Sequence, residues 1–508
     1  MTNSLILALD QGTTSTRAIV FDALGQPLAS AARPVTNTYP ADGWVEHDPE
    51  EIRRASVEVL QEAVKASGRD TAEIAGIGIT NQRETVVVWN KATGKPIGPA
   101  IVWQDRRTAG HCEALRAQGH EPAVVAATGL LLDPYFSGSK IAWLLDNIPG
   151  ARAAAARCEL LAGTMDCWLI WNLTGGKRHV TDATNASRTL LFDIHRQEWS
   201  PAMLDLLNVP VACLPQVLDC AAPFGNLEPA ILGRSIPICG VAGDQQASLM
   251  GQGCIAPGQM KATFGTGTFM LLNTGDAAPV SKSRLLTTVA ARLDGKTRYA
   301  LEGSIFIAGA AIDWLSVELG VAGDPKAAEA LAMSARPGHG VVVVPAFTGL
   351  GAPWWDPAAR GAILGLTRDS GLAEICAATF DACALQTRDL IEAMRTDAPY
   401  AFTAQADGQG AQLCCDGGMI RSAWFSQRLA DITNLPVHRA AFQDTTALGA
   451  AWAKSRLPWA LSRRSSPAYI SKVGTFHCGA CATVAGPASA IKRASRAEIR
   501  SCTSGSAR

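Results

Sequence analysis

Four short segments combine glycine with charged or hydroxyl side chains, and each has the composition of a ligand-binding turn. The first is LDQGTTSTR (residues 9–17), where an apolar run ends at Asp10 and is followed by Gly12, several hydroxyls and Arg17. Backbone N–H groups and hydroxyls that converge on a tight turn suit a phosphate, and an adjacent aspartate suits Mg²⁺. The segment therefore predicts a phosphate and metal site, with an ordinary hairpin carrying solvated hydroxyls as the alternative.

The other three segments are equally open to two interpretations. In TNQRET (80–85), Arg83 and Glu84 either point inward from a strand end to bind hydroxyls or lie in an exposed turn. In GVAGDQQAS (240–248), Asp244 is either a helix N-cap or a base that accepts a hydroxyl proton during phosphoryl transfer. In CCDGGMI (414–420), the paired glycines either let the backbone approach a flat ligand or form a plain turn.

The elements around these segments indicate an α/β architecture. Short apolar runs predict strands at 4–10 and 74–82, two more strands lie within 16–35, and a helix is expected over 48–67 with Asp48 as N-cap and Pro49 in its first turn. Helical periodicity returns at 372–395 and 445–455. Residues 258–275 repeat the strand, hydroxyl-glycine turn and strand of the opening, which predicts a duplicated domain with a ligand between the copies.

Composition restricts the function classes. Of the 508 residues 48% are hydrophobic and 18% charged, so a large core is expected and global disorder is not. A net charge of zero gives no whole-chain reason to expect nucleic acid, and no apolar stretch is long enough to predict a membrane span. The absence of a leader and the 14 scattered cysteines predict a cytoplasmic protein with reduced thiols.

In their order along the chain, these segments resemble the FGGY carbohydrate-kinase family. The resemblance extends over residues 4–455 through GWVEHDP, YFSGSKIAWLLDN, AGDQQASLMGQ, TFGTGTF and PAFTGLGAPWWDPAARGAILGLTR, among others. NQRET and GAPWWD are similar to the substrate loops of members that phosphorylate glycerol rather than a sugar. The resemblance implies two actin-like, ribonuclease-H-like domains, 1–247 and 248–455, with an ATP cleft between them. It also implies Mg²⁺, sn-glycerol 3-phosphate as product, and a homodimer or homotetramer.

The resemblance also assigns site residues by position. Asp244 would be the general base, assisted by Asp10 and Arg17, with Asp10 and Asp244 close to the metal. The phosphate turn would comprise Gly12, Thr13, Thr14, Ser15 and Arg17. The glycerol site would comprise Arg83, Glu84, Trp103, Tyr135, Asp244, Gln245 and Phe269. The nucleotide contacts would be Thr266, Gly309, Asp313, Gly418 and Ser422.

Three features depart from the family pattern. Asp313 replaces the usual Gln and Ser422 the usual Asn, which predicts weaker ATP binding or a changed base preference. An inactive binding homologue is an alternative function. A kinase for another small polyol or ketose is the other alternative. Residues 456–508 form an atypical basic tail with nine Lys or Arg and one Glu. A shifted reading frame is the favoured explanation of the tail, and a genuine partner-binding segment is the alternative.

Overall fold

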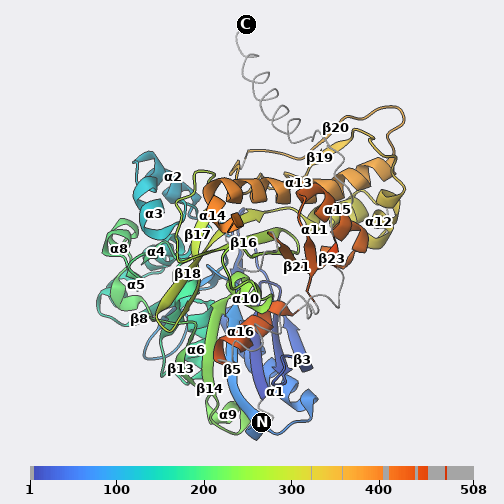
Figure 1. Ribbon diagram of the computed structural model, residues 1–508. Coiled ribbons are helices and arrows are strands. Elements are labelled where there is room, and N and C mark those ends of the chain that lie inside the picture. Colours follow the sequence, from blue (N-terminus) through green and yellow to red (C-terminus); the bar gives the residue numbers. More distant parts are fainter. Residues whose placement is uncertain are drawn as a thin grey trace.

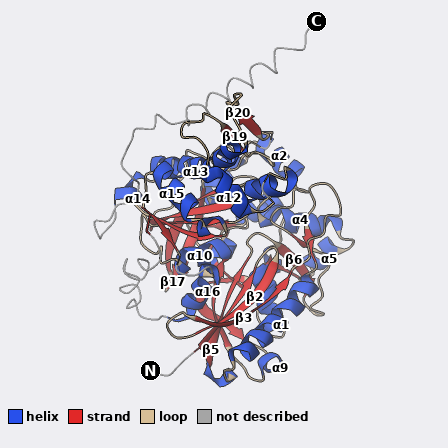
Figure 2. Cartoon of the chain, turned by 90° about the vertical axis from the view of Figure 1, so that its right-hand side faces the viewer, coloured by secondary structure: helices blue, strands red, loops and turns tan. Residues whose placement is uncertain are grey.

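The chain folds around two large β-sheets, one built mainly from each half of the sequence (Figure 1). The computed structural model describes residues 5–321, 323–356, 358–403, 411–440, 444–455 and 475–476. Of the basic tail, only residues 475–476 are described, as a short strand. The predictions for the tail therefore lie outside the described residues. Helices cover the outer faces of the sheets (Figure 2).

The N-terminal sheet has the order β13-β14-β5-β1-β2-β3. Its first three strands form an antiparallel meander, β5 and β14 then run parallel to β1, and β13 is antiparallel to β14. The strands are β1 (Leu5–Gln11), β2 (Ser15–Phe21), β3 (Pro27–Pro34), β5 (Ile74–Asn81), β13 (Ala221–Asn226) and β14 (Pro237–Gly243).

The C-terminal sheet repeats this plan in the order β17-β18-β16-β15-β21-β22-β23. A β15–β16–β18 antiparallel meander is followed by β21 and β22, both in the direction of β15. The strands are β15 (Met260–Phe264), β16 (Thr268–Gly275), β17 (Leu286–Leu293), β18 (Lys296–Ile305), β21 (Leu413–Gly417), β22 (Val437–Arg439) and β23 (Thr475–Phe476). The predicted duplication and the α/β fold class are therefore confirmed.

The long helices begin where local sequence predicts them. Helix α1 (Pro49–Ser67) starts after Asp48, whose carboxylate accepts the N–H of Glu50, and it packs on β2 and β3. Helix α13 (Leu372–Asp397) packs against α12 (Pro325–Met333) and α15 (Ala423–Thr433) over the C-terminal sheet. One core lies under each sheet, with Val59 and Ile79 in the first and Phe264 and Phe425 in the second.

A smaller four-stranded sheet, β4-β7-β6-β8, flanks the N-terminal sheet, and Trp103 lies just after its strand β7. Its strands are β4 (Glu46–His47), β6 (Val86–Asn90), β7 (Ala100–Ile101) and β8 (Leu160–Thr164). The remaining helices are α2 (Ala109–Ala117), α3 (Glu121–Thr128), α4 (Ser137–Asn147), α5 (Ala151–Ala156), α6 (Met165–Leu173), α7 (Ala183–Ala186), α8 (Pro201–Leu207), α9 (Pro229–Leu232), α11 (Gly309–Asp313) and α14 (Pro399–Thr403). The remaining strands are β9 (Val180–Asp182), β10 (Phe192–Asp193), β11 (Glu198–Trp199), β12 (Gln216–Leu218), β19 (Val342–Val344) and β20 (Ala362–Leu364).

Two helices cross between the sheets, α10 (Asp244–Gly251) and α16 (Thr445–Ser455) (Figure 1). Helix α16 follows β22 of the C-terminal sheet in the chain, yet it packs on β1, β5 and β14 of the N-terminal sheet. The crossing is close enough that a Cβ on Gly449 would lie 1.8 Å from the carbonyl oxygen of Ala247. Within the residues described, none of the helices combines the length and apolar composition of a membrane span.

Candidate active site

The turn between β1 and β2 has the shape expected of a tight hairpin. The N–H of Gly12 donates to the carbonyl oxygen of Ser15 over 2.9 Å, and Asp10 lies opposite Arg17 in the strand register. Thr14 is exposed, and Gly12, Thr13 and Ser15 are partly exposed. The turn therefore presents hydroxyls and backbone groups outward, as a phosphate site requires.

A buried polar chain holds this turn from behind. The Gln82 side-chain amide donates to the carbonyl oxygen of Gly12 over 3.3 Å and to His47 Nδ1 over 3.3 Å. His47 Nε2 in turn donates to Asn37 Oδ1 over 2.7 Å. Burial lowers the pKa of His47 to about 4, so this imidazole is neutral at physiological pH and keeps the tautomer that both contacts require. Sequence analysis singled out neither His47 nor Gln82.

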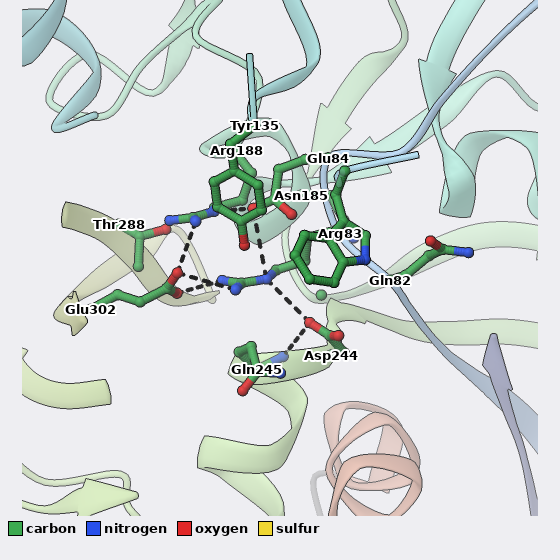
Figure 3. Close-up of polar contacts among 12 residues, drawn as sticks. Gln82, Arg83, Glu84, Tyr135, Asn185, Arg188, Asp244, Gln245, Thr288 and Glu302 are labelled. Carbon is green, nitrogen blue, oxygen red and sulfur yellow. Dashed lines mark hydrogen bonds and ion pairs between the residues drawn. The ribbon is translucent and has the colours of Figure 1, made fainter. Parts of the chain in front are cut away.

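Arg83 and Glu84 are almost fully buried, at 2% side-chain exposure each, so the exposed-turn alternative is wrong. Glu84 has a φ of 61°, a left-handed conformation that is uncommon outside glycine. Arg83 Nε lies 3.1 Å from Asp244 Oδ1, and its two terminal nitrogens contact Glu302 over 2.5 and 3.1 Å (Figure 3). The predicted pair thus faces the predicted base.

A second arginine completes what we call the buried charge cluster: Arg83, Glu84, Arg188, Asp244 and Glu302. Arg188 Nε donates to Glu84 Oε1 over 2.6 Å, and its Nη2 donates to Glu302 Oε1 over 2.8 Å (Figure 3). Sequence analysis missed Arg188 and Glu302. The available signal was a single charge inside an apolar run, in NASRTLLF and in YALEGSIF.

Burial and pairing set the charges in this cluster. Burial works against ionisation of Glu302, but Arg188 and Arg83 together hold its pKa below the usual range. Burial raises the pKa of Asp244, with Arg83 and Lys261 acting in the opposite direction. Lys261 on β15 donates to the Gln245 side-chain oxygen and to Thr263 Oγ1, and burial lowers its pKa to about 8. Acids and bases here compensate one another, as buried charges must.

Three aromatic rings from distant segments form an apolar wall beside these charges. The ring centroid of Trp103 lies 5.7 Å from that of Tyr135 and 6.0 Å from that of Phe269, both in edge-on geometry. The Trp103 indole N–H donates to Thr13 Oγ1 over 2.8 Å. This hydrogen bond connects the apolar wall directly to the β1–β2 turn.

The predicted nucleotide residues gather at the C-terminal sheet. Thr266 occupies the β15–β16 turn, and its carbonyl oxygen accepts the N–H of Ala308, next to Gly309. A Cβ on Gly309 would lie 2.5 Å from the carbonyl oxygen of Gly265 and 3.7 Å from Met419, the neighbour of Gly418. The β15–β16 turn, the start of α11 and the end of β21 therefore meet at one place.

The two unusual residues lie near this place but differ in their surroundings. Asp313 is exposed at the end of α11. Ser422 is the N-cap of α15, where its hydroxyl accepts the N–H of Phe425 over 2.8 Å and donates to Glu329 over 2.6 Å. The Ser422 hydroxyl thus has a structural function within the chain.

Asp10 and Arg17 occupy the ends of the two hairpin strands. Burial raises the pKa of Asp10 to about 7, Arg17 opposes this, and the charge of Asp244 adds to it. The two like-charged carboxylates of Asp10 and Asp244 are oxygen donors of the kind that Mg²⁺ prefers, so the residues present fit a divalent cation. Arg17 also forms an ion pair with Asp444, immediately before α16, a partner that the sequence did not indicate.

Comparison with known proteins agrees with the duplicated fold. Residues 5–251 match the N-terminal domain of the FGGY family of carbohydrate kinases, and residues 260–456 match its C-terminal domain. The chain is 55% identical over 447 residues to glycerol kinase 1 of Pseudomonas aeruginosa and to glycerol kinase of Ectopseudomonas mendocina, covering 88% of this chain and 89% of each relative.

Solved structures give the same result. A Plasmodium falciparum glycerol kinase with ADP superposes with a TM-score of 0.88 at 32% identity, covering 98% of both chains. Xylulose kinase from Lactobacillus acidophilus, at 21% identity, shares the fold with a TM-score of 0.79 over 99% of both chains. Because the two family domains together match most of its length, the chain belongs to the FGGY family of carbohydrate kinases.

Proposed function

We propose that this protein transfers the γ-phosphoryl group of ATP to a terminal hydroxyl of glycerol and releases sn-glycerol 3-phosphate. The observation that carries the proposal is the pairing of charged groups with an apolar wall. Arg83, Glu84 and Asp244 supply the charged groups, and the rings of Trp103 and Phe269 supply the apolar surface. A small polyol has the matching character, with hydroxyls that need charged partners and a carbon backbone that does not. Similarity to curated glycerol kinases supports the same substrate.

Asp244 is the proposed general base. Its Oδ1 already accepts the N–H of Gln245 over 2.7 Å and lies 3.1 Å from Arg83 Nε. These two contacts orient the carboxylate and leave Oδ2 as the oxygen that takes the proton of the attacking hydroxyl. The Asp244 side chain is 30% exposed, so the carboxylate is accessible to a substrate.

ATP is proposed to lie between the two sheets, with its phosphates at the β1–β2 turn and its nucleoside near Thr266, Gly309 and Gly418. Asp313 and Ser422 border the same region in this proposal. Mg²⁺ would be held by Asp10 and Asp244, where it would neutralise the phosphate charge that opposes attack. Arg17 supplies a further cation at the turn.

Replacement of the proposed base tests the assignment. We expect Asp244→Asn to reduce glycerol-dependent ADP release by about 10²–10⁴-fold, because a positioned base contributes that much to a transfer step. The matched control is Asp146→Asn. Asp146 lies at the surface on α4 and forms an ion pair with Arg152, so its replacement should leave the rate unchanged. Wild-type-like activity in Asp244→Asn would disprove the role.

A substrate panel tests the glycerol assignment itself. The coupled ADP assay should give a higher kcat/KM for glycerol than for other small polyols and for ketoses. Preference for one of those compounds would replace glycerol as the substrate, and a lack of turnover with the whole panel would favour an inactive binding homologue.

We also propose the division into domains 1–247 and 248–455, a cytoplasmic location and an assembly of two or four copies. The described cysteines are free thiols, which supports a reducing compartment. Light scattering coupled to size-exclusion chromatography tests the assembly, because a mass near 53.3 kDa would identify a monomer and contradict it.

A further inference from the structure

Glu302 differs from the rest of the buried charge cluster in its origin. It belongs to β18 of the C-terminal sheet, whereas Arg83, Glu84, Arg188 and Asp244 all come from residues that match the N-terminal domain. Its side chain is fully buried and contacts both arginines. Two arginines of the N-terminal half thus share one carboxylate supplied by the opposite sheet.

The contacts of Glu302 determine how Arg83 is oriented. The Glu302 carboxylate accepts hydrogen bonds from both terminal nitrogens of Arg83, over 2.5 and 3.1 Å. The nitrogen of Arg83 that faces Asp244 is therefore Nε. A two-point contact of this kind fixes the plane of the guanidinium as well as its position. Gln246 Oε1 also accepts from Arg83 Nη1, over 3.3 Å. Loss of the Glu302 carboxylate would leave the terminal nitrogens with this neutral partner, beside the acids Asp244 and Glu84.

The same carboxylate separates two like charges. Arg83 and Arg188 are both buried, and Glu302 Oε1 accepts from both of them, over 3.1 and 2.8 Å. Two guanidinium groups that share a dry site repel each other strongly unless an acid lies between them. Glu302 is therefore needed to keep Arg83 at the glycerol site and Arg188 on Glu84.

We propose that Glu302 is a positioning residue for glycerol, which acts from the C-terminal sheet through Arg83 and Arg188 and need not touch the substrate. This inference rests on the proposed function. It deepens that function because the glycerol site becomes complete only when the C-terminal sheet is docked on the N-terminal domain. Glycerol affinity is then coupled to the contact between the two sheets.

Glu302→Gln is the informative variant, because it keeps the shape but gives Arg83 an amide N–H₂ in place of one oxygen. We expect the KM for glycerol to rise about tenfold, the cost of one charge-assisted hydrogen bond, while the KM for ATP changes by less than about twofold. Glu302→Asp retains the charge on a shorter side chain and should recover part of the loss.

The control is Asp219→Asn, which breaks a different contact between the two halves, the 2.7 Å ion pair of Asp219 with Arg292 on β17. It should leave the KM for glycerol unchanged. If the control raises the KM for glycerol as much as Glu302→Gln does, Glu302 is only a docking contact and the proposal fails. It also fails if Glu302→Gln raises both KM values in parallel or neither.

A binding measurement separates this inference from the proposed function. Glycerol should raise the Tm of the nucleotide-free wild type, and the same glycerol concentration should raise that of Glu302→Gln much less. Failure of the wild type to phosphorylate or bind glycerol overturns the proposed function. Equal glycerol shifts in wild type and Glu302→Gln overturn the positioning role, and if Glu302→Gln does not fold, Glu302→Asp decides by the same two comparisons.

Discussion

At the scale of single residues, the site depends on buried polar groups that hydrogen-bond to one another. His47 is the clearest case, because it is 1% exposed and held between Asn37 and Gln82 in its neutral form. Gln82 in turn donates a hydrogen bond to the carbonyl oxygen of Gly12 in the β1–β2 turn, so His47 helps to hold this turn in place. Protonation of His47 would place a second donor against the Gln82 amide, so the turn loses its support when the imidazole is charged.

This arrangement predicts a specific loss of stability in acid. The pKa of His47 falls from 6.5 in the unfolded chain to about 4 in the folded protein, so the unfolded state binds the extra proton first as the pH is lowered. The contribution is complete above pH 6.5 and is lost as the pH falls toward 4, and between pH 7.5 and 5 it amounts to about 2 kcal/mol.

Urea unfolding of the wild type and of His47→Gln at both pH values measures this difference. The wild type should lose about 2 kcal/mol more than the variant between the two pH values. His179, whose pKa burial also lowers to about 4, is present in both proteins and cancels. Equal losses would contradict the assignment to His47.

At the scale of elements, the crossing of α10 and α16 connects the proposed base to a helix from the C-terminal half of the chain. Asp244 is the first residue of α10, and Gly243 is its N-cap, so the N-cap alternative for Asp244 is wrong. The N–H of Gly243 is fixed by Thr184 Oγ1 over 2.9 Å. Since the helix backbone carries Asp244, any displacement of α10 by α16 moves the carboxylate.

Gly449→Ala should therefore reduce both stability and activity. A Cβ at this position would lie 1.8 Å from the carbonyl oxygen of Ala247, a contact with backbone that no rotamer relieves. We expect a loss of about 2 kcal/mol or more in the free energy of unfolding, together with a lower kcat. Gly110→Ala is the control, because that helical glycine has nothing within 4 Å of the added Cβ and should be neutral or slightly stabilising.

At the scale of the whole molecule, the two sheets repeat one plan, and the proposed ligand sites lie at the corresponding hairpin turns. The β1–β2 turn carries the proposed phosphate site, and the β15–β16 turn carries Thr266 of the proposed nucleotide site. Glu302 and Arg292 connect the halves by ion pairs, and α16 crosses from one to the other. Glycerol and nucleotide should therefore favour the same docked arrangement.

Thermal unfolding can detect this coupling. Each ligand at about 100 times its Kd should stabilise the folded protein by about 2.7 kcal/mol. With a non-hydrolysable ATP analogue, Mg²⁺ and glycerol together, the rise in Tm should exceed the sum of the rises with glycerol alone and with the nucleotide alone, because the first ligand already meets the cost of docking. Strictly additive shifts would show that the two sites are independent.

The sequence by itself determined the features that depend on neighbouring residues. Hairpin turns, the capped start of α1 and the duplicated plan follow from local pattern, because turn geometry, capping and strand alternation act within a few positions. Family resemblance added the proposed roles of Asp244, Trp103 and Phe269.

Only the tertiary structure decided which distant charges meet. Local pattern left Arg83 and Glu84 either buried or exposed. It did not indicate that Arg83 would pair with Glu302, or Glu84 with Arg188. Nor did it indicate that Arg17 would pair with Asp444. Nor did it place α16 on the N-terminal sheet. Such contacts join positions more than a hundred residues apart, and they form because buried charges must find compensation wherever the packed sheets and helices bring an opposite charge within reach.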